Sequence, residues 1–259
     1  MEFADQAIIV TGAGYGIGRE IALAFGRQGG NVVLAARSRE KLEAVATELK
    51  AMKTKPLVIT LDVSKEAEVA AMVKQVQGAY GRIDVLVNNS GIGGPTALAR
   101  DVAGDQWRET IDINLSGSFY CAKYVSEVMI PAKRGNIVNI SSVAGRIGFA
   151  LRTPYAASKW GLIGLSHSLA AELGPHNIRV NAVTPGPIEG ERIKRQMRDR
   201  AKAEGKEFDA LMRGQVAGLP LGRMPTEAEV ANAVVYLASS MSGGITGQVL
   251  GVDGGMRMQ

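Results

Sequence analysis

A tyrosine and a lysine four residues apart carry the most informative chemistry of this sequence. Tyr155 and Lys159 share one face if their segment is helical, because residues four apart in a helix are neighbours. A lysine charge favours the phenolate and lowers a tyrosine pKa that is otherwise about 10. Ser142, thirteen residues upstream, carries a hydroxyl that can polarise a substrate oxygen. These groups could move a proton to or from a carbonyl or an alcohol, although on spacing alone chance remains the alternative.

Short apolar segments alternate with longer amphipathic ones along the chain, and these elements must position the trio. Strand-like segments lie at 7–11, 32–36, 57–61, 84–88, 136–141, 178–183 and 248–252. Helical patterns lie between them near 17–29, 39–52, 65–79, 105–130, 155–173 and 226–238. This alternation predicts an α/β fold, a doubly wound parallel sheet of about seven strands with helices on both faces. The strands are nearly all apolar, as expected when both sheet faces are covered.

The 259 residues contain no segment that resembles a linker. We therefore expect one domain over 1–259, a length that suits an α/β unit. The exception to the alternation is 187–225, a strongly charged segment between two strands. It is expected to form a helical flap over the substrate.

Composition narrows the function classes. No apolar run is long enough to span a membrane, so no membrane association is expected. The net charge of +5 is spread along the chain apart from 191–213, and it suits an anionic cofactor, so nucleic-acid binding is not expected. Two histidines, His167 and His176, and the lone Cys121 are too few for a usual zinc site, so no metal is expected. The single cysteine and the absence of a signal-peptide pattern favour a cytoplasmic protein.

A glycine-rich segment follows the first strand-like run and precedes a helical pattern. Glycines let the backbone turn tightly and let a pyrophosphate approach the helix N-terminus, where free N–H groups favour anions. This context predicts a dinucleotide-binding loop, the alternative being a purely structural turn. The residues of the loop are Gly12, Gly14, Tyr15, Gly16, Ile17 and Gly18.

The end of the second strand bears on the choice of cofactor. Ala36 occupies the position where an acid would hold the ribose 2′-hydroxyl of NAD, and Arg37 follows it. A guanidinium suits a 2′-phosphate, so NADP(H) is favoured and NAD(H) stays possible. The alternative is a solvated arginine at a strand end. Asp62, after the third strand, either accepts a hydrogen bond from the adenine amino group or caps the next helix.

A series of short motifs runs along the chain: TGAGYGIG at 11–18, Asp62-Val63, Asn88-Asn89-Ser90-Gly91, Asn114, Ser142, Tyr155 with Lys159, Pro185-Gly186 and Val252-Asp253-Gly254-Gly255. In these motifs and their order, the chain resembles, over residues 6 to 255, the short-chain dehydrogenases/reductases, in particular their short, single-domain oxidoreductase branch. The resemblance implies a Rossmann-type sheet, nicotinamide-dependent oxidation or reduction, and a homotetramer or homodimer packed through the helices near 105–130 and 155–173, with 251–259 at a further interface.

The resemblance also implies residue roles. Tyr155 would be the general acid in reduction and the base in oxidation, and Lys159 would lower its pKa and hold the nicotinamide ribose. Ser142 would bind the substrate oxygen, with Ser141 as the alternative, and Asn114 would hold a water that links Lys159 to solvent. The implied cofactor contacts comprise the glycine loop and Arg37, Asp62, Val63, Asn88, Gly91, Tyr155, Lys159, Pro185, Gly186 and Ile188. Asn89 would tie strands together instead.

Three departures from the family's pattern bear on the cofactor. Ser90 replaces a usual alanine, and no threonine follows Pro185-Gly186 to contact the cofactor. Tyr15 stands where many NADP-preferring relatives have a basic residue.

The predicted activity is hydride transfer between NADP(H) and a small ketone or secondary alcohol. A 3-oxoacyl-acyl-carrier-protein reductase is an alternative, although the helix after the Tyr-Lys pair lacks that group's typical arginine. An alternative of another class is a non-catalytic NADP-binding regulator or scaffold. The substrate pocket is expected to include Ser142, Phe149, Arg152, Glu189 and Arg192. The two arginines could bind an anion or could be exposed rim charges.

Overall fold

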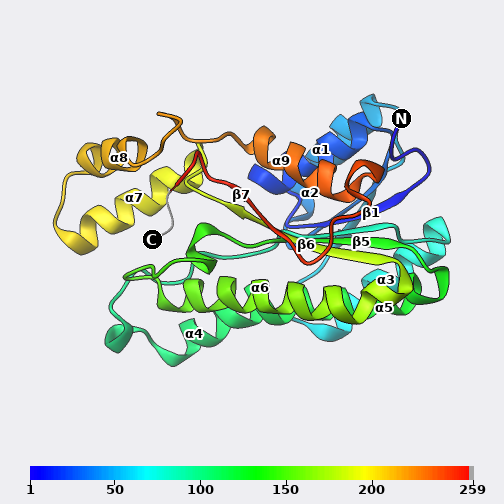
Figure 1. Cartoon of the computed structure of the whole chain (residues 1–259), viewed down its shortest axis with the longest axis horizontal. Helices are drawn as coiled ribbons and strands as arrows, with labels where there is room; N and C mark the ends of the chain where they lie inside the picture. Colours follow the sequence, from blue (N-terminus) through cyan, green and yellow to red (C-terminus); the bar gives the residue numbers. More distant parts are fainter. Residues whose placement is uncertain (257–259) are drawn as a thin grey trace.

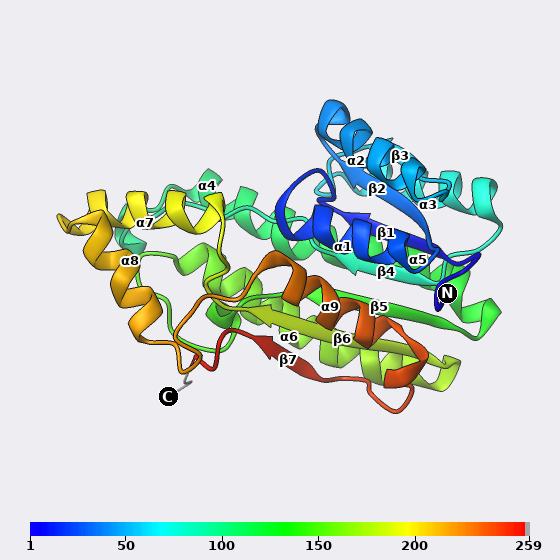
Figure 2. The same ribbon diagram turned by 90° about the horizontal axis from the view of Figure 1, so that it is seen from above.

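Seven parallel strands form one sheet in the computed structural model, which describes residues 1–256 (Figures 1 and 2). The strand order is β3-β2-β1-β4-β5-β6-β7, and every neighbouring pair is parallel. The predicted doubly wound α/β fold is therefore confirmed. The strands are β1 (Ala7–Thr11), β2 (Asn31–Ala36), β3 (Leu57–Thr60), β4 (Val85–Asn88), β5 (Gly135–Ile140), β6 (Ile178–Pro185) and β7 (Val249–Val252).

Helices cover both faces of the sheet (Figure 1). On one face lie α1 (Gly16–Arg27), α2 (Arg39–Ala51) and α9 (Glu227–Ala238), and on the other lie α3 (Glu66–Tyr80), α4 (Gly104–Ile111), α5 (Gly117–Ala132) and α6 (Thr153–Leu173). Alternate residues of β1 enter different cores, because side chains alternate across a strand. Ile8 and Val10 pack in the core of α1, α2 and α9, whereas Ile9 packs in that of α3 and α5. Two apolar layers thus hold the carboxyl ends of the strands in fixed positions.

The helix predicted over 105–130 differs from the sequence expectation. It is divided into α4 and α5 by a π-helical turn at Asp112–Ser116. Asn114 lies in this turn and is fully buried. Its Oδ1 accepts from the Ile92 amide at 2.8 Å, and its Nδ2 donates to the Ile92 carbonyl at 3.0 Å. The wider turn accommodates a side chain that anchors the loop after β4, which agrees with the frequent occurrence of π-turns at functional sites.

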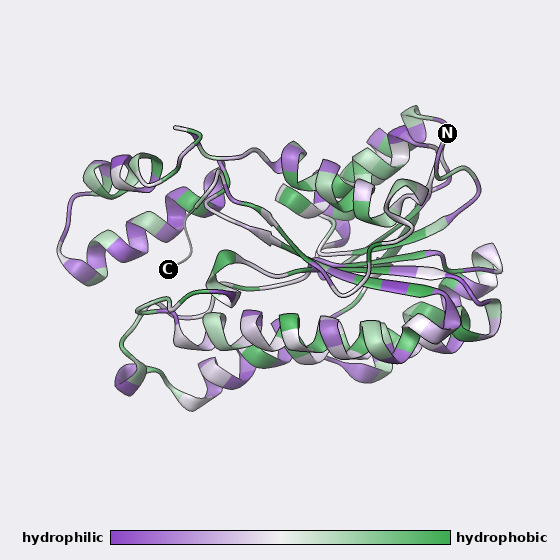
Figure 3. Ribbon diagram, viewed as in Figure 1, coloured by the Kyte–Doolittle hydropathy of each residue, from purple (hydrophilic) through white to green (hydrophobic). Residues whose placement is uncertain are grey.

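Two helices project beyond the carboxyl ends of the strands, α7 (Glu191–Glu204) and α8 (Phe208–Ala217) (Figures 1 and 2). We call residues 187–225, which contain them, the flap. Ile193, Met197, Leu219 and Met224 form a small core of its own. Hydrophilic residues predominate on α7 (Figure 3), so little of this helix faces apolar surroundings. The flap is thus joined to the rest of the chain through few apolar contacts.

No helix within residues 1–256 has both the length and the apolar character needed to cross a membrane.

Candidate active site

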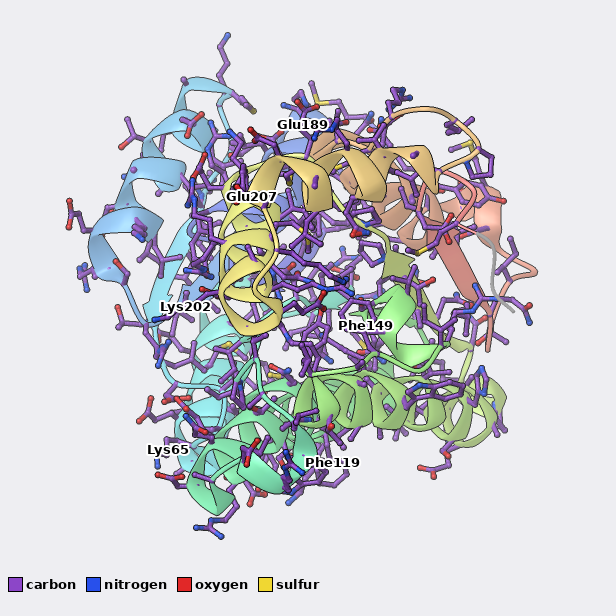
Figure 4. The ribbon with its side chains drawn as sticks, turned by 90° about the vertical axis from the view of Figure 1, so that its left-hand side faces the viewer. Lys65, Phe119, Phe149, Glu189, Lys202 and Glu207 are labelled. Carbon is purple, nitrogen blue, oxygen red and sulfur yellow. The ribbon has the colours of Figure 1, made fainter. Side chains whose placement is uncertain are left out.

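A cavity of about 1100 Å³ lies at the carboxyl ends of the strands beside the flap. Parallel α/β sheets bind ligands at this edge, where the chain reverses its winding direction between β1 and β4. The cavity volume exceeds that of a typical small-molecule site, and it is thus large enough for a dinucleotide together with a small substrate. Figure 4 looks onto this end of the molecule from the side of the flap.

Helix α6 brings Tyr155 and Lys159 together at this cavity. Pro154 lies in its first turn, where proline is tolerated, so Tyr155 occupies the first turn as well. Lys159 is 3% exposed. Its Nζ donates to the Ile140 carbonyl at 2.8 Å and lies 5.8 Å from the centre of the Tyr155 ring. The end of β5 therefore fixes the ammonium beside the phenol.

The environment shifts both ionisations. Burial acts to raise the pKa of Tyr155, but the charges of Arg192, Lys159 and Arg152 and the hydroxyl of Ser142 outweigh it, and the pKa is lowered from its ordinary value. Burial lowers the pKa of Lys159 to about 8, against the opposing effect of Tyr155. The pKa values of both groups are thus shifted toward neutral pH, which is typical of side chains that transfer protons at functional sites.

Two adjacent serines after β5 differ in their contacts. Ser141 donates from its hydroxyl to the Lys159 carbonyl at 2.8 Å, and so ties β5 to α6. The Ser142 oxygen accepts from the Ala144 amide at 3.2 Å. Both line the cavity. Ser141 thus uses its proton on the backbone, whereas the Ser142 hydroxyl has no backbone acceptor among the described residues, so Ser142 rather than Ser141 can donate to a substrate oxygen.

Gly91 lies where Asn114 and Lys159 meet. A Cβ added to Gly91 would lie 3.1 Å from Asn114 Oδ1 and 3.5 Å from Lys159 Nζ. The Asn114 side chain is nevertheless behind the cavity wall, where its Nδ2 also donates to Ser158 Oγ at 3.0 Å. The structure therefore places Asn114 next to the pair and fixes it to the backbone of the neighbouring loop.

The glycine-rich segment between β1 and α1 forms a cradle on the cavity wall. Gly12 and Gly16 have φ values of 68° and 60°, which favour glycine. A Cβ on Gly18 would collide with the Gly12 carbonyl oxygen, so the close approach requires glycine there. Helix α1 begins without a side-chain cap, which leaves the amides of its first turn for an anion. These features fit a pyrophosphate. The predicted residues Gly12, Gly14, Tyr15, Gly16, Ile17 and Gly18 all line the cavity.

Two cations lie where the cavity passes the end of β2. Arg37 follows Ala36, as the sequence indicated, and both line the cavity. Lys41 also lines it, with Nζ 5.1 Å from the centre of the Tyr15 ring. Lys41 was not predicted from the sequence, although it lies in the first turn of α2, the helix that follows Arg37. Many NADP-preferring relatives have a basic residue at the position of Tyr15, and in this chain Lys41 places a positive charge next to that position.

Asp62 and Val63 line the same end of the cavity. The Asp62 carboxylate accepts from the Ser64 amide at 3.0 Å and from its hydroxyl at 2.8 Å. Burial acts to raise the pKa of Asp62. The two hydrogen bonds from Ser64 and the charge of Arg37 together lower it by more, so the net shift is downward. Asp62 therefore orders the turn before α3 and is also exposed to a ligand.

Asn88 differs from the sequence expectation. It is 2% exposed, donates to Asn139 Oδ1 at 2.9 Å and to the Ser118 carbonyl at 3.1 Å, and is absent from the cavity lining. Its side chain lies in the apolar layer under the sheet, because neighbouring residues of a strand point to opposite faces. Asn89 lines the cavity instead, and its Nδ2 donates to the carbonyls of Thr11 and Gly12 at 2.9 and 3.2 Å. Asn89 therefore does tie β1 to the segment after β4, as expected, and also lines the cavity.

The opposite end of the cavity is formed by segments after β5 and β6. Pro185, Gly186 and Ile188 line it. So do the predicted substrate residues Phe149, Glu189 and Arg192, of which Figure 4 labels the first two on different elements. Arg152 departs from this group, because it lines a second, smaller cavity next to the first. In the described part of the chain no cluster of three or more His, Cys, Asp or Glu side chains could hold a metal ion.

Comparison with known proteins places this site in a family. The sequence profile of the family described as Enoyl-(Acyl carrier protein) reductase matches residues 12–257. The 3-oxoacyl-acyl-carrier-protein reductase FabG of Thermotoga maritima is 39% identical over 256 residues, which cover 99% of each chain. The fold is similar to that of an NAD+-bound xylitol dehydrogenase, with a TM-score of 0.96 and 31% identity over 98% of this chain and 100% of that one.

A second solved structure, an actinorhodin polyketide ketoreductase with NADPH, has a TM-score of 0.92 and 34% identity over 97% of each chain. These likenesses span the sheet, the glycine cradle and the tyrosine–lysine pair together. The chain belongs to the short-chain dehydrogenase/reductase family of NAD(P)(H)-dependent oxidoreductases.

Proposed function

We propose that this oxidoreductase acts on a small ketone or secondary alcohol with NADP(H), and that Tyr155 transfers the proton. The observation that carries the proposal is the convergence of Tyr155, Lys159 and Ser142 on the cavity that the glycine cradle also lines. One end of this cavity fits the phosphates of a dinucleotide, and the other end holds groups for acid–base chemistry.

The proposed mechanism divides the work between cofactor and protein. The nicotinamide supplies or accepts the hydride when it is bound. Ser142 donates a hydrogen bond to the substrate oxygen, and the Tyr155 hydroxyl gives its proton to that oxygen in reduction or takes it in oxidation. Lys159 stabilises the phenolate that results, because an ammonium beside a phenolate favours the ionised form. Burial of Lys159 strengthens this interaction by excluding water.

Asn114 is proposed to maintain the proton route rather than to react. Its amide spans from the Ile92 backbone to Ser158, and Asn114 Oδ1 and Lys159 Nζ both lie close to Gly91. A water held at this point would connect the ammonium to solvent. Asn114 is therefore a positioning residue in this scheme.

The preference for NADP(H) rests on charge. Arg37 and Lys41 flank the part of the cavity that adjoins the end of β2, and Ala36 supplies no carboxylate there. Two cations without an acid favour a 2′-phosphate over a 2′-hydroxyl.

A carrier-bound 3-oxoacyl substrate is the second candidate, favoured by the identity of 39–40% with FabG proteins. Against it, the exposed face of α6 presents Glu172 and no arginine near its end, where an acidic carrier protein would need positive charge. The small-substrate proposal agrees better with this surface and with the solved xylitol dehydrogenase and levodione reductase structures, which are similar over 98% of this chain.

Self-association is proposed through α5 and α6. Phe119 on α5 and Trp160 on α6 are large apolar side chains that are 44% and 52% exposed. Figure 4 shows Phe119 on the outer side of α5. A second copy packed on these helices would cover both. We also propose that 1–259 act as one domain, with the flap, 187–225, over the substrate.

An activity panel tests the proposed function. Purified protein is assayed with NADPH and with NADH against small ketones, cyclic ketones and an acetoacetyl-carrier-protein substrate. We expect turnover of small ketones, with NADPH preferred by at least about tenfold in kcat/KM. Turnover of the carrier-bound substrate alone would support the second candidate, and binding of cofactor without turnover of any substrate would support the regulator.

A further inference from the structure

A second cavity of about 360 Å³ adjoins the large one on the side of the flap. Its walls are the loop after β4, helix α4 and helix α7. Both cavities share Ile92, Arg192, Arg195 and Gln196 as lining residues. A molecule that reacts at Tyr155 can therefore extend into the smaller cavity without leaving the site.

Arg152 lies on the wall of this smaller cavity and is 7% exposed. Its Nη2 donates to the Gly93 carbonyl at 2.7 Å, and its Nη1 contacts Thr96 Oγ1 at 3.4 Å. Its buried Nε has no hydrogen-bond partner among the described residues. A buried donor without a partner is unfavourable, so the guanidinium retains capacity for a ligand.

The charges around the smaller cavity do not balance. Arg192 and Arg195 stand on α7 and face the cavity with Arg152. Two acids, Glu109 and Asp199, also line it, against three arginines. Arg192 and Arg195 act to lower the pKa of Arg152 after the larger effect of burial, and only Tyr155 and Asp199 oppose them. An anion between these arginines would relieve the repulsion.

We propose that the smaller cavity is a subsite for the carboxylate of the substrate, and that Arg152 is its principal ligand. The inference rests on the proposed function and deepens it, because it makes the substrate a short keto acid or hydroxy acid. Arg152 Cζ lies 5.3 Å from the centre of the Tyr155 ring, so the carboxylate would stand only a few bonds from the carbonyl that is reduced. Arginine pairs with carboxylates through two parallel hydrogen bonds, which also fixes their orientation.

The flap arginines complete the subsite in this account. Arg192 and Arg195 are exposed on α7, on the side opposite the buried Arg152. A bound carboxylate would attract α7 toward the loop after β4 and so hold the flap over the reacting carbonyl. Binding of the anion and exclusion of water from Tyr155 would then occur together.

Matched substrate pairs test the proposal. Acetoacetate and levulinate are compared with their methyl esters, which differ from them in charge at the same position. The wild-type protein is expected to favour each acid over its ester by at least about tenfold in kcat/KM, the usual scale for a charge-assisted pair. In Arg152→Gln this acid-to-ester ratio should fall by at least about tenfold, and Arg152→Lys should recover part of it. The ratio cancels any effect of Arg152 on Tyr155 itself.

The control is Arg213→Gln, which removes an arginine that is exposed on α8 and lines neither cavity. It should leave the acid-to-ester ratio unchanged. If Arg152→Gln does not fold, as judged by circular dichroism, the exposed Arg192→Gln and Arg195→Gln variants replace it and should each lower the ratio by about threefold or more. An unchanged ratio in the arginine variants of the cavity, or a wild-type preference for the esters, overturns the proposal.

A binding measurement separates this proposal from the proposed function. Calorimetry measures acetoacetate and methyl acetoacetate binding to Tyr155→Phe with NADPH, with and without Arg152→Gln. Acetoacetate should bind more tightly than its methyl ester, and Arg152→Gln should abolish this difference. That result supports the carboxylate subsite even if no ketone is turned over. Equal binding of acid and ester rejects the subsite, even if small neutral ketones are reduced.

Discussion

The catalytic proposal depends on a balance between burial and charge at Tyr155. Burial opposes ionisation of the phenol, whereas Arg192, Lys159 and Arg152 favour it, and the pKa falls. Lys159 alone is a weaker explanation than the sequence suggested, since Arg192 on the flap has the larger effect. Proton transfer and flap position are therefore linked through electrostatics.

Replacing the lysine should move the pH profile. In the proposed mechanism oxidation requires the Tyr155 phenolate, so its rate should rise with pH through the Tyr155 pKa and the rate of reduction should fall there. In Lys159→Met the phenolate loses a neighbouring cation, and the midpoint of the oxidation profile should move upward by about one unit or more. Steady-state rates between pH 6 and 11 measure it. Lys74→Met, on the exposed side of α3, should leave the midpoint in place.

Cofactor choice should depend on Arg37. The Arg37→Gln variant removes a guanidinium that lines the cavity at the end of β2. KM for NADPH should rise by about 10- to 100-fold, as expected when a charged hydrogen bond to phosphate is lost. KM for NADH should change little. Arg39→Gln is the matched control, because Arg39 is exposed and pairs with Glu43. Equal effects of Arg37→Gln on both cofactors would remove the argument for NADP(H).

At the residue scale, most of the predicted site residues line the cavity, because the family's motifs specify residue types and spacing. Asn88 does not, and its orientation could not be predicted, since the motif does not say which of two neighbouring asparagines faces the cavity. The burial of Arg152 and its unpaired Nε could not be predicted from the sequence either. A lone arginine in a loop gives no sign that it will be enclosed by two distant elements.

At the scale of the elements, the flap shares few buried apolar contacts with the rest of the fold. Its core consists of Ile193, Met197, Leu219 and Met224, apart from the two large cores of the sheet. Segments with few buried contacts open at a lower free energy than the core does. The flap is therefore suited to admit substrate while the sheet stays folded.

Truncation of the flap core should loosen the flap selectively. Met197 is 1% exposed, and Met197→Ala should cost about 2–5 kcal/mol within that core. Hydrogen exchange in α7 and α8 should accelerate, while amides of β1, β4 and β5 keep their protection. Met72→Ala, equally buried in α3, should lower global stability without a selective effect on the flap. Uniform acceleration across the sheet in Met197→Ala would show that the flap is not an independent unit.

The order and type of the elements could be predicted from periodicity, and the division of 105–130 could not. Its apolar pattern is continuous, so nothing local marks a π-turn. The turn arises because Asn114 bonds to the Ile92 backbone in a distant loop. Such a tertiary contact has no counterpart in local sequence.

For the whole molecule, the doubly wound sheet explains why residues so far apart in sequence meet. The glycine cradle follows β1, Ser142 follows β5 and the flap follows β6, and parallel strands deliver all three to one edge. Helix α6 enters the site from beside the sheet and carries the tyrosine–lysine pair. The glycine cradle and Arg37 come from the first half of the chain, and Ser142, Tyr155 and Lys159 come from the second.

The most direct measurement of the central claim is single-turnover oxidation of NADPH by Tyr155→Phe, with cofactor affinity measured on the same protein. The substrate is whichever ketone the wild-type protein reduces fastest. The variant should lose about 100- to 10,000-fold in the rate of the chemical step, the usual contribution of a positioned acid. Its Kd for NADPH should stay within about threefold of wild type, since the cradle is untouched. A variant that keeps most of the wild-type rate would show that the proton comes from another group.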